Sequence, residues 1–452
     1  MNDRQMDMTQ GRPGKILIFF AVPIFFGNVF QQLYNICDSI IVGQFVGADA
    51  LAAVGICGSP HGVFVALNMG LSTGIGIMVA QMFGARQEKR IRATIVNALL
   101  LICSSAVVTG GVGFAASSAV LRLLGTPEGI FADALIYMRL LFINTLGMAA
   151  YNCVTGILRA MGDSRTPLYF LVFSSILNIL LNVLLVTVIP LGVMGVGLAT
   201  VLANLISAAA VFIYARKKYV YFRFGADEIR AEKDIILSLL RAGLPLGLQS
   251  TTISISAMVL QGFVNSFGET VIAANTVIVK FDNLLNMPLN SLSMALSTYT
   301  GQNIGAGMQK RIKEGYHTSL RMAAVYSAVV FIIGHTCGEM FVKLFVNAEP
   351  ELLDYGARGI AIYSSVVISL AMIYINRSIL NGSGDTAFAM VIGLVEIIGR
   401  VGFAFLYVTV LKSGPQGLWY TAVSNWTLTG LVCLIRYLSG AWKKKAYISF
   451  QS

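Results

Sequence analysis

The stretch Gly84–Ile91, which reads GARQEKRI, returns 221 residues later as Gly305–Ile312, which reads GAGMQKRI. A second pair has nearly the same offset, with ILRAMGDS at Ile157–Ser164 and ILNGSGDT at Ile379–Thr386. Single residues also recur in order, namely Pro23 with Pro245, Gly47 with Gly268, and Gly192 with Gly414. This ordered series indicates an internal duplication, which in an apolar chain is typical of transporter architecture.

The composition is that of a membrane protein. Of the 452 residues, 56% are hydrophobic and 12% are charged, whereas soluble domains carry about 25% charged residues. Apolar runs such as 172–188 and 193–214 approach or reach the roughly 20 residues that cross a bilayer. We therefore expect an all-α integral membrane protein that has little room for a soluble domain.

Apolar segments separated by basic or glycine- and proline-containing turns predict twelve spans, six in each half. In the first half they cover residues 15–42, 50–81, 92–120, 131–158, 166–189 and 192–215. In the second half they cover residues 235–263, 271–303, 315–345, 352–380, 387–411 and 416–438. The chain is thus predicted to form two six-helix lobes, at 1–215 and 235–452, joined by a linker at 216–234. The small-xxx-small patterns at Gly70 and Gly74 and at Gly58 and Gly62 favour close helix packing.

The chain has a net charge of +11, and the positions of its Lys and Arg residues predict its orientation in the membrane. The connections near 82–92, 159–165, 216–234 and 304–314 are basic, while those near 43–49, 189–191 and 264–270 contain no Lys or Arg. By the positive-inside rule, the linker and both termini are cytoplasmic, and we expect no nucleic-acid partner. Because each lobe has an even number of spans, the lobes are expected to be related by a pseudo-two-fold axis along the membrane normal.

The sequence lacks the motifs for ATP hydrolysis, for a disulfide framework and for a transition-metal site. The chain has no GxxxxGK[ST] phosphate-binding loop, so we expect energy from an ion gradient and not from ATP. Its six cysteines and three histidines are scattered, so we expect neither a disulfide framework nor a metal site, except one that could take Na⁺. We expect no cofactor, with H⁺ or Na⁺ as the coupling ion, and no enzymatic activity.

Several short motifs resemble the multidrug and toxic compound extrusion (MATE) family. NICDSIIVG at Asn35–Gly43 closes the first span, LAAV at Leu51–Val54 opens the second, and QNIGA at Gln302–Ala306 follows the eighth. The Gly-Asp turns that begin at Gly162 and Gly384 fit as well. The resemblance covers nearly the whole chain. It implies twelve helices in two six-helix lobes, and export of lipophilic, often cationic compounds in exchange for protons or sodium.

Asp38 lies toward the outer end of the first span, where a carboxylate is costly unless it binds an ion, is protonated or finds donors. The resemblance implies a coupling-ion site, and the alternative is a helix-end carboxylate satisfied by water or hydroxyl groups. Asn178 and Asn182, one turn apart, and Thr200 add uncharged oxygens, which suit a monovalent better than a divalent cation. Interhelical hydrogen bonding is the asparagines' alternative role. Many family members carry a second carboxylate where Asn182 stands, so the resemblance does not extend to a two-acid proton relay in this lobe.

Asp282 and Glu396 are the acidic residues expected within spans of the second half. We interpret both as candidates for binding a substrate cation or a proton. For Glu396 the alternative is a structural ion pair with Arg400, one turn further on. Met287 and Met294 either line an adaptable cavity for apolar cations or pack in the core.

Pro23 and Pro245 fall inside the first span of each half, where proline removes a backbone hydrogen bond. They are candidate hinges, and static kinks are the alternative.

Together these features predict an ion-coupled multidrug exporter of a bacterial cytoplasmic membrane. We expect a monomer among membrane lipid, with small-molecule drugs and organic cations as substrates. A flippase for a lipid or lipid-linked sugar on a related scaffold is the first alternative, against which the number of spans argues. A non-transporting scaffold or receptor is the second, and the lack of a sizeable soluble domain argues against it.

Overall fold

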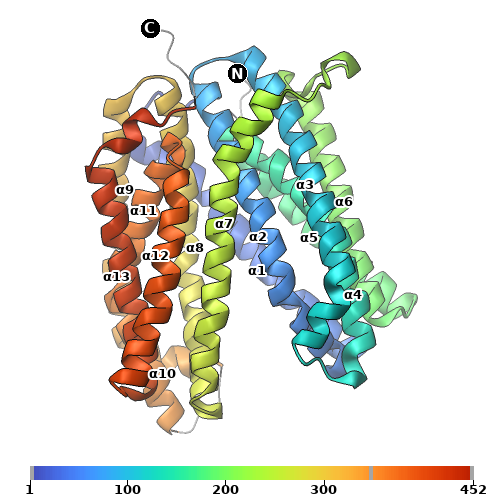
Figure 1. Cartoon of the computed structure of the whole chain (residues 1–452), viewed down its shortest axis with the longest axis vertical. Coiled ribbons are helices and arrows are strands. Elements are labelled where there is room, and N and C mark those ends of the chain that lie inside the picture. Colours follow the sequence, from blue (N-terminus) through green and yellow to red (C-terminus); the bar gives the residue numbers. More distant parts are fainter. Residues whose placement is uncertain (1–4, 346–349, 448–452) are drawn as a thin grey trace. The chain divides into compact units, whose positions relative to one another are not determined.

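The computed structural model describes residues 5–345 and 350–447, which are mostly helical and contain no strand (Figure 1). The all-α class predicted from the sequence is confirmed. Three of the α-helices continue into a π-helical turn. These turns are η1 (Val42–Val46), η2 (Leu184–Val188) and η5 (Phe405–Val410).

The first compact unit contains the described residues up to Asp7 together with Val22–Gly247. Its helices are most of α1 (Pro13–Ile41), α2 (Ala48–Gly84), α3 (Glu88–Leu123), α4 (Glu128–Ala160), α5 (Arg165–Val183), α6 (Gly192–Lys218) and the start of α7 (Lys233–Asn265). Helix α4 packs against α2, α3 and α6, and α5 packs against α6. The buried side chains of Cys57, Met138, Phe142 and Val196 belong to its core.

The second compact unit contains Met8–Ala21 and the described residues from Leu248 onward. After the end of α7, its helices are α8 (Glu269–Gly305), α9 (Gln309–Lys343), α10 (Pro350–Ser365), α11 (Val367–Ser383), α12 (Ala387–Ala404) and α13 (Gly417–Leu438). Helix α11 packs against α8, α9 and α13, while α12 packs mainly against α13.

The helices agree with the twelve predicted spans, with two differences. Within the described residues, ten helices are long and apolar enough to cross a membrane, or eleven if α10 and α11 form one span. The predicted span 352–380 is this pair, which bends by 45° at its break. The predicted span 271–303 is α8, whose 37 residues do not meet the same criterion. Helix α8 contains polar side chains that are buried inside the second unit, among them Gln302 and Asn303.

The two compact units do not have the same boundaries as the predicted lobes 1–215 and 235–452. The start of α1 belongs to the second unit, and the linker and the start of α7 belong to the first. Met8 is fully buried, its N–H donates to Gln302 Oε1 at 3.0 Å, and Arg311 donates to its carbonyl at 3.3 Å. Helices α1 and α7 thus each begin in one unit and end in the other, with Pro23 and Pro245 within two residues of the change.

The linker is fastened to the first unit by hydrogen bonds at both of its ends. The Tyr219 hydroxyl donates to the Asp163 carboxylate, and the Glu232 N–H donates to Asn97 Oδ1 at 2.7 Å. Burial, and then the bond to Asp163, raises the pKa of Tyr219 above its usual range, so the phenol stays protonated as the donor.

Helices α2 and α7 approach each other closely within the first unit. A Cβ at Gly70 would lie 2.1 Å from the Gly247 nitrogen, and one at Gly74 would lie 2.4 Å from the Gly243 Cα. The small-residue pattern at Gly70 and Gly74 is therefore confirmed as a packing contact. The second small-residue pattern, at Gly58 and Gly62, does not form a packing contact, because a Cβ added at either glycine would have no described atom of a neighbour within 4 Å.

The repeat is visible in the Gly-Asp turns. Gly162 has φ +88° and Gly384 has φ +96°, which only glycine adopts readily. An added Cβ would also lie 2.2 Å from the Met6 oxygen and 2.4 Å from the Lys445 oxygen, respectively. Equivalent turns of the two halves therefore share both their backbone conformation and their close packing.

Candidate functional site

A chain of polar side chains joins three helices of the first unit. Asp38 lies near the end of α1, Asn178 and Asn182 lie one turn apart on α5, and Thr200 lies on α6. Asn182 Nδ2 donates to Asp38 Oδ1 and to Asn178 Oδ1, each at 2.6 Å. Asn178 Nδ2 in turn donates to Thr200 Oγ1 at 3.3 Å. The structure thus brings the four predicted residues together in one hydrogen-bonded cluster, here called the Asp38 cluster.

The Asp38 cluster leaves one buried oxygen without a donor. Asn182 is fully buried, Asn178 and Thr200 are nearly so, and Asp38 is half-buried. Both Nδ2 hydrogens of Asn182 are engaged, but its Oδ1 atom has no hydrogen-bond partner among the described residues. An unpaired buried amide oxygen costs free energy, and a bound water or cation is the kind of partner that would satisfy it.

Two tyrosines that sequence reasoning missed lie near enough to Asp38 to interact with its charge. Tyr34 precedes Asp38 by one turn of α1, and it lies close to Thr200 of α6. Tyr137, a buried residue of α4, is close enough to interact with the charge of Asp38. The one-turn spacing could have revealed Tyr34, whereas no local pattern connects Tyr137 to this cluster.

The arrangement suits a proton or one monovalent cation. It offers a single carboxylate among amide, hydroxyl and phenol oxygens, whereas a divalent ion usually requires more negative charge. Among the described residues, no group of three or more His, Cys, Asp or Glu could hold a metal ion. The interhelical alternative for the asparagines is also realised, because the bond from Asn178 to Thr200 joins α5 to α6. The two roles are compatible, since ion ligands have to be held in place.

A second polar network, made of partly buried side chains, lies in the second unit. Asp282 on α8 accepts a hydrogen bond from Asn286 Nδ2 at 3.0 Å, and the Tyr374 hydroxyl on α11 donates to Asn286 Oδ1 at 2.8 Å. The guanidinium of Arg377 lies 5.1 Å from the ring centroid of Tyr374. Of these, only Asp282 was expected from the sequence.

Arg400 pairs with Glu396 and also interacts with the charge of Asp282. Its NH2 group pairs with Glu396 Oε1 at 3.4 Å along α12, and both side chains are largely buried, at 17% and 11% exposure. Arg400 is also close enough to interact with the charge of Asp282 on α8. Glu396 Oε2 is buried without a partner among the described residues. The ion pair considered from the sequence is therefore present, and its cation also interacts with the charge of Asp282.

The remaining candidates are placed but not joined to these networks by any described hydrogen bond or ion pair. Met287 and Met294 are half-buried on α8, and their role stays a prediction. Pro23 and Pro245 lie inside α1 and α7, as expected. Lys280, which also lies on α8, stands over the ring of Phe345, two residues past the end of α9, at 4.6 Å from its centroid.

Comparison with known proteins decides the family. The sequence model of the MatE family matches the chain twice, at residues 23–184 and 245–406. The chain belongs to the MatE family. This confirms the resemblance to MATE transporters, and the constant offset of 222 residues between the two matches confirms the internal duplication.

The similarity extends over whole proteins. "Probable multidrug resistance protein YpnP" of Bacillus subtilis (strain 168) is 28% identical, over 97% of each chain. "Probable multidrug resistance protein YoeA" of the same organism is also 28% identical, over 94% of this chain and 93% of that one. A crystal structure described as MATE in the bent conformation aligns with a TM-score of 0.89 at 23% identity, over 97% of this chain and 98% of that one.

Family membership and the helices together make this chain a multi-pass membrane transporter of MATE architecture. MATE proteins are transporters rather than enzymes.

Proposed function

We propose that this chain is a secondary active multidrug exporter that exchanges small lipophilic or cationic compounds for H⁺ or Na⁺. Membership of the MatE family and the multidrug resistance names of its relatives support export of drugs. The Asp38 cluster carries the proposal of ion coupling, because it holds a carboxylate beside a buried amide oxygen that lacks a partner.

Asp38 is the residue that takes the coupling ion. Protonation removes the negative charge to which Asn182 donates, and Na⁺ would favour rotation of the Asn182 amide so that its oxygen faces the ion. Either event changes the bond from Asn182 to Asp38 and, through Asn178, the link to Thr200. The occupied and empty sites therefore favour different arrangements of α1, α5 and α6. Coupling follows if substrate prefers one of the two arrangements.

The network of the second unit is proposed to meet the substrate or a further proton. Asp282 would provide the negative charge for an organic cation, with Met287 and Met294 of α8 as adaptable apolar neighbours. Glu396 would act in the same network through Arg400. Pro23 and Pro245 are proposed as hinges, because α1 and α7 pass from one unit to the other beside them.

The protein is proposed to act as a monomer in the bacterial cytoplasmic membrane, with both termini and the linker in the cytoplasm. The basic linker supports this orientation. No cofactor other than the coupling ion is required by the proposed exchange. The alternative, a lipid or lipid-linked sugar flippase, predicts that the gene restores growth to a strain deficient in such a flippase.

The test is drug export by an Asp38→Asn variant in cells that lack their own efflux pumps. Ethidium accumulation should rise to the level of cells without the transporter, while the amount of protein in the membrane stays at the wild-type level. Asp354→Asn is the matched control, because Asp354 is an exposed partner of Arg358 on α10 and should leave export intact. Wild-type export by Asp38→Asn would rule out the proposed role of Asp38.

A further inference from the structure

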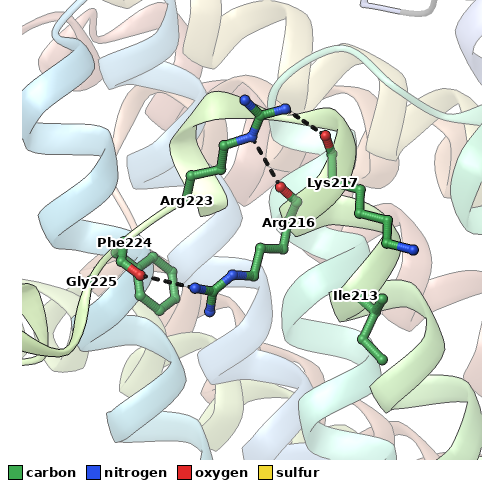
Figure 2. Close-up of a pocket in the computed structure, with 6 residues that line it drawn as sticks. All are labelled: Ile213, Arg216, Lys217, Arg223, Phe224 and Gly225. Atoms are coloured by element: carbon green, nitrogen blue, oxygen red, sulfur yellow. Dashed lines mark hydrogen bonds between the residues drawn. The ribbon is translucent and has the colours of Figure 1, made fainter.

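A cationic pocket lies where α6 meets the linker (Figure 2). It is an open hollow of about 630 Å³ that is lined by six residues, which are Ile213, Arg216, Lys217, Arg223, Phe224 and Gly225. Three of the six carry a positive charge and none carries a negative one. All six belong to the first unit.

Two guanidinium groups fold the linker back onto the end of α6. Arg223 donates from Nε to the Arg216 carbonyl at 3.3 Å and from NH2 to the Lys217 carbonyl at 2.6 Å. Arg216 donates to the Phe224 carbonyl at 3.5 Å, as the dashed lines in Figure 2 show. These bonds cap carbonyls at a helix C-terminus, where cations are favourable. They also hold the side chains of Arg216 and Arg223 at the pocket.

The bonds that shape the pocket do not neutralise it. The acceptors are backbone carbonyls, which carry no net charge, and each guanidinium has five N–H donors. Among the described residues, none of Arg216, Lys217 and Arg223 forms an ion pair with a carboxylate.

The nearby acidic residues do not fill the pocket. Glu228 pairs with Arg92 at 2.8 Å and accepts the Gly225 N–H at 3.0 Å. Asp227 lies against Gly225 at the linker side of the pocket. Because Arg92 balances Glu228, the three lining cations face one carboxylate, and an excess of positive charge remains.

The place of the pocket along α6 puts it at a membrane surface. Helix α6 is one of the membrane spans and ends at Lys218. Two of the lining cations, Arg216 and Lys217, therefore lie in its last turn. Ile213, one turn earlier, is 53% exposed and lines the same pocket. An apolar wall on the span side and cations on the linker side match the two ends of a phospholipid, its acyl chains and its phosphate.

We propose that this pocket binds the phosphate headgroup of an anionic phospholipid from the leaflet next to the linker. The planar forks of Arg216 and Arg223 match phosphate oxygens, and Lys217 adds a mobile point charge. The acyl chains would run along the exposed face of α6 at Ile213. A free phosphate ion would not use that apolar wall, so the site is assigned to lipid. The assignment is independent of the transport mechanism.

The test measures lipid binding to the purified full-length protein by native mass spectrometry. The protein is mixed with phosphatidylglycerol, which is anionic, or with phosphatidylcholine, which is zwitterionic. Lys217→Gln is the first variant, because no described contact of the Lys217 side chain supports the fold. It should lower the affinity for phosphatidylglycerol about fivefold, as expected for one cation near an anionic headgroup, and leave phosphatidylcholine binding unchanged. Arg216→Gln combined with Lys217→Gln should lower it further.

Lys310→Gln combined with Lys313→Gln is the matched control, since it removes the same charge from exposed positions of α9 outside the pocket. The proposal holds if only the pocket variants lose preference for phosphatidylglycerol. It is overturned if Lys217→Gln and the double pocket variant bind phosphatidylglycerol like wild type. It is also overturned if the control loses as much, or if millimolar inorganic phosphate displaces the lipid from wild type.

Discussion

Replacing Arg400 should destabilise the second unit far more than replacing Glu396, although the two residues form one ion pair. Arg400→Met leaves the buried Glu396 carboxylate without its ion-pair partner and removes the positive charge that interacts with the partly buried Asp282. Glu396→Gln keeps the side-chain shape and leaves Arg400 beside Asp282. An isolated i,i+4 pair would instead lose about the same stability whichever partner is removed.

The magnitudes follow from burial and distance. At 3.4 Å and an effective dielectric constant of about 20, the attraction between Arg400 and Glu396 is about 5 kcal/mol before desolvation is subtracted. Removing one partner of a buried pair costs about 3–5 kcal/mol, which is the expectation for Arg400→Met. Glu396→Gln should cost about 1 kcal/mol, comparable to one net hydrogen bond.

The assay is thermal unfolding of the purified protein in detergent. For a unit of this size a loss of 1 kcal/mol lowers the midpoint by roughly 2–4 °C, so Arg400→Met should melt at least about 6 °C below wild type and Glu396→Gln within about 4 °C of it. Arg358→Met is the control, because its pair with Asp354 is 61% and 59% exposed and contributes less than about 0.5 kcal/mol. Equal losses from Arg400→Met and Glu396→Gln would refute the interaction of Arg400 with Asp282.

Two further predictions concern the packing of the units. Gly74→Leu should abolish the monodisperse peak in size-exclusion chromatography, because even a Cβ at this position would lie 2.4 Å from the Gly243 Cα. The control variant Gly58→Leu should keep the peak. A normal peak from Gly74→Leu would contradict the close approach of α2 and α7. Arg311→Met removes the donors to the Met8 and Gly11 carbonyls and to Asn303. The buried Met8 amide should then exchange its hydrogen at least about tenfold faster, which is equivalent to about 1.4 kcal/mol. Unchanged exchange at Met8 would show that Arg311 does not hold the start of the chain.

The Asp38 cluster could be predicted because its signals are local. Asn178 and Asn182 share a helix face through their one-turn spacing, and a lone carboxylate inside an apolar span needs partners. That these partners would be the same asparagines came from the family resemblance. In the structure Asn182 donates to Asp38 at 2.6 Å, and Asn178 joins the cluster through Asn182. The unpaired oxygen of Asn182 could not be anticipated, because it depends on which way the amide points.

The network around Asp282 was only partly predictable. The i,i+4 spacing revealed the pair of Glu396 with Arg400, but the approach of Arg400 to Asp282 depends on how α12 lies against its neighbours. The bend between α10 and α11 likewise has no proline at the break, where Val366 stands. Tertiary packing determines both features, and apolar periodicity carries no information about it.

The sequence also did not predict that α1 and α7 would each begin in one unit and end in the other. The repeat predicted two equal halves, and the family match confirms that they exist. Hydrogen bonds from Gln302 and Arg311 nevertheless attach the start of the chain to the second unit. The motif around Gln302 that supported the family resemblance thus has a structural role in holding Met8.

Export is proposed to be driven by an ion gradient that acts through Asp38. This coupling is tested most directly by uptake of a lipophilic cation into proteoliposomes in which an H⁺ gradient and a Na⁺ gradient are imposed separately. The account predicts that at least one gradient drives uptake by the wild-type protein, and that Asp38→Asn lowers this uptake by about 5- to 150-fold, the range of typical coupling energies. Substrate uptake that ignores both gradients, or that persists at the wild-type rate in Asp38→Asn, would contradict it.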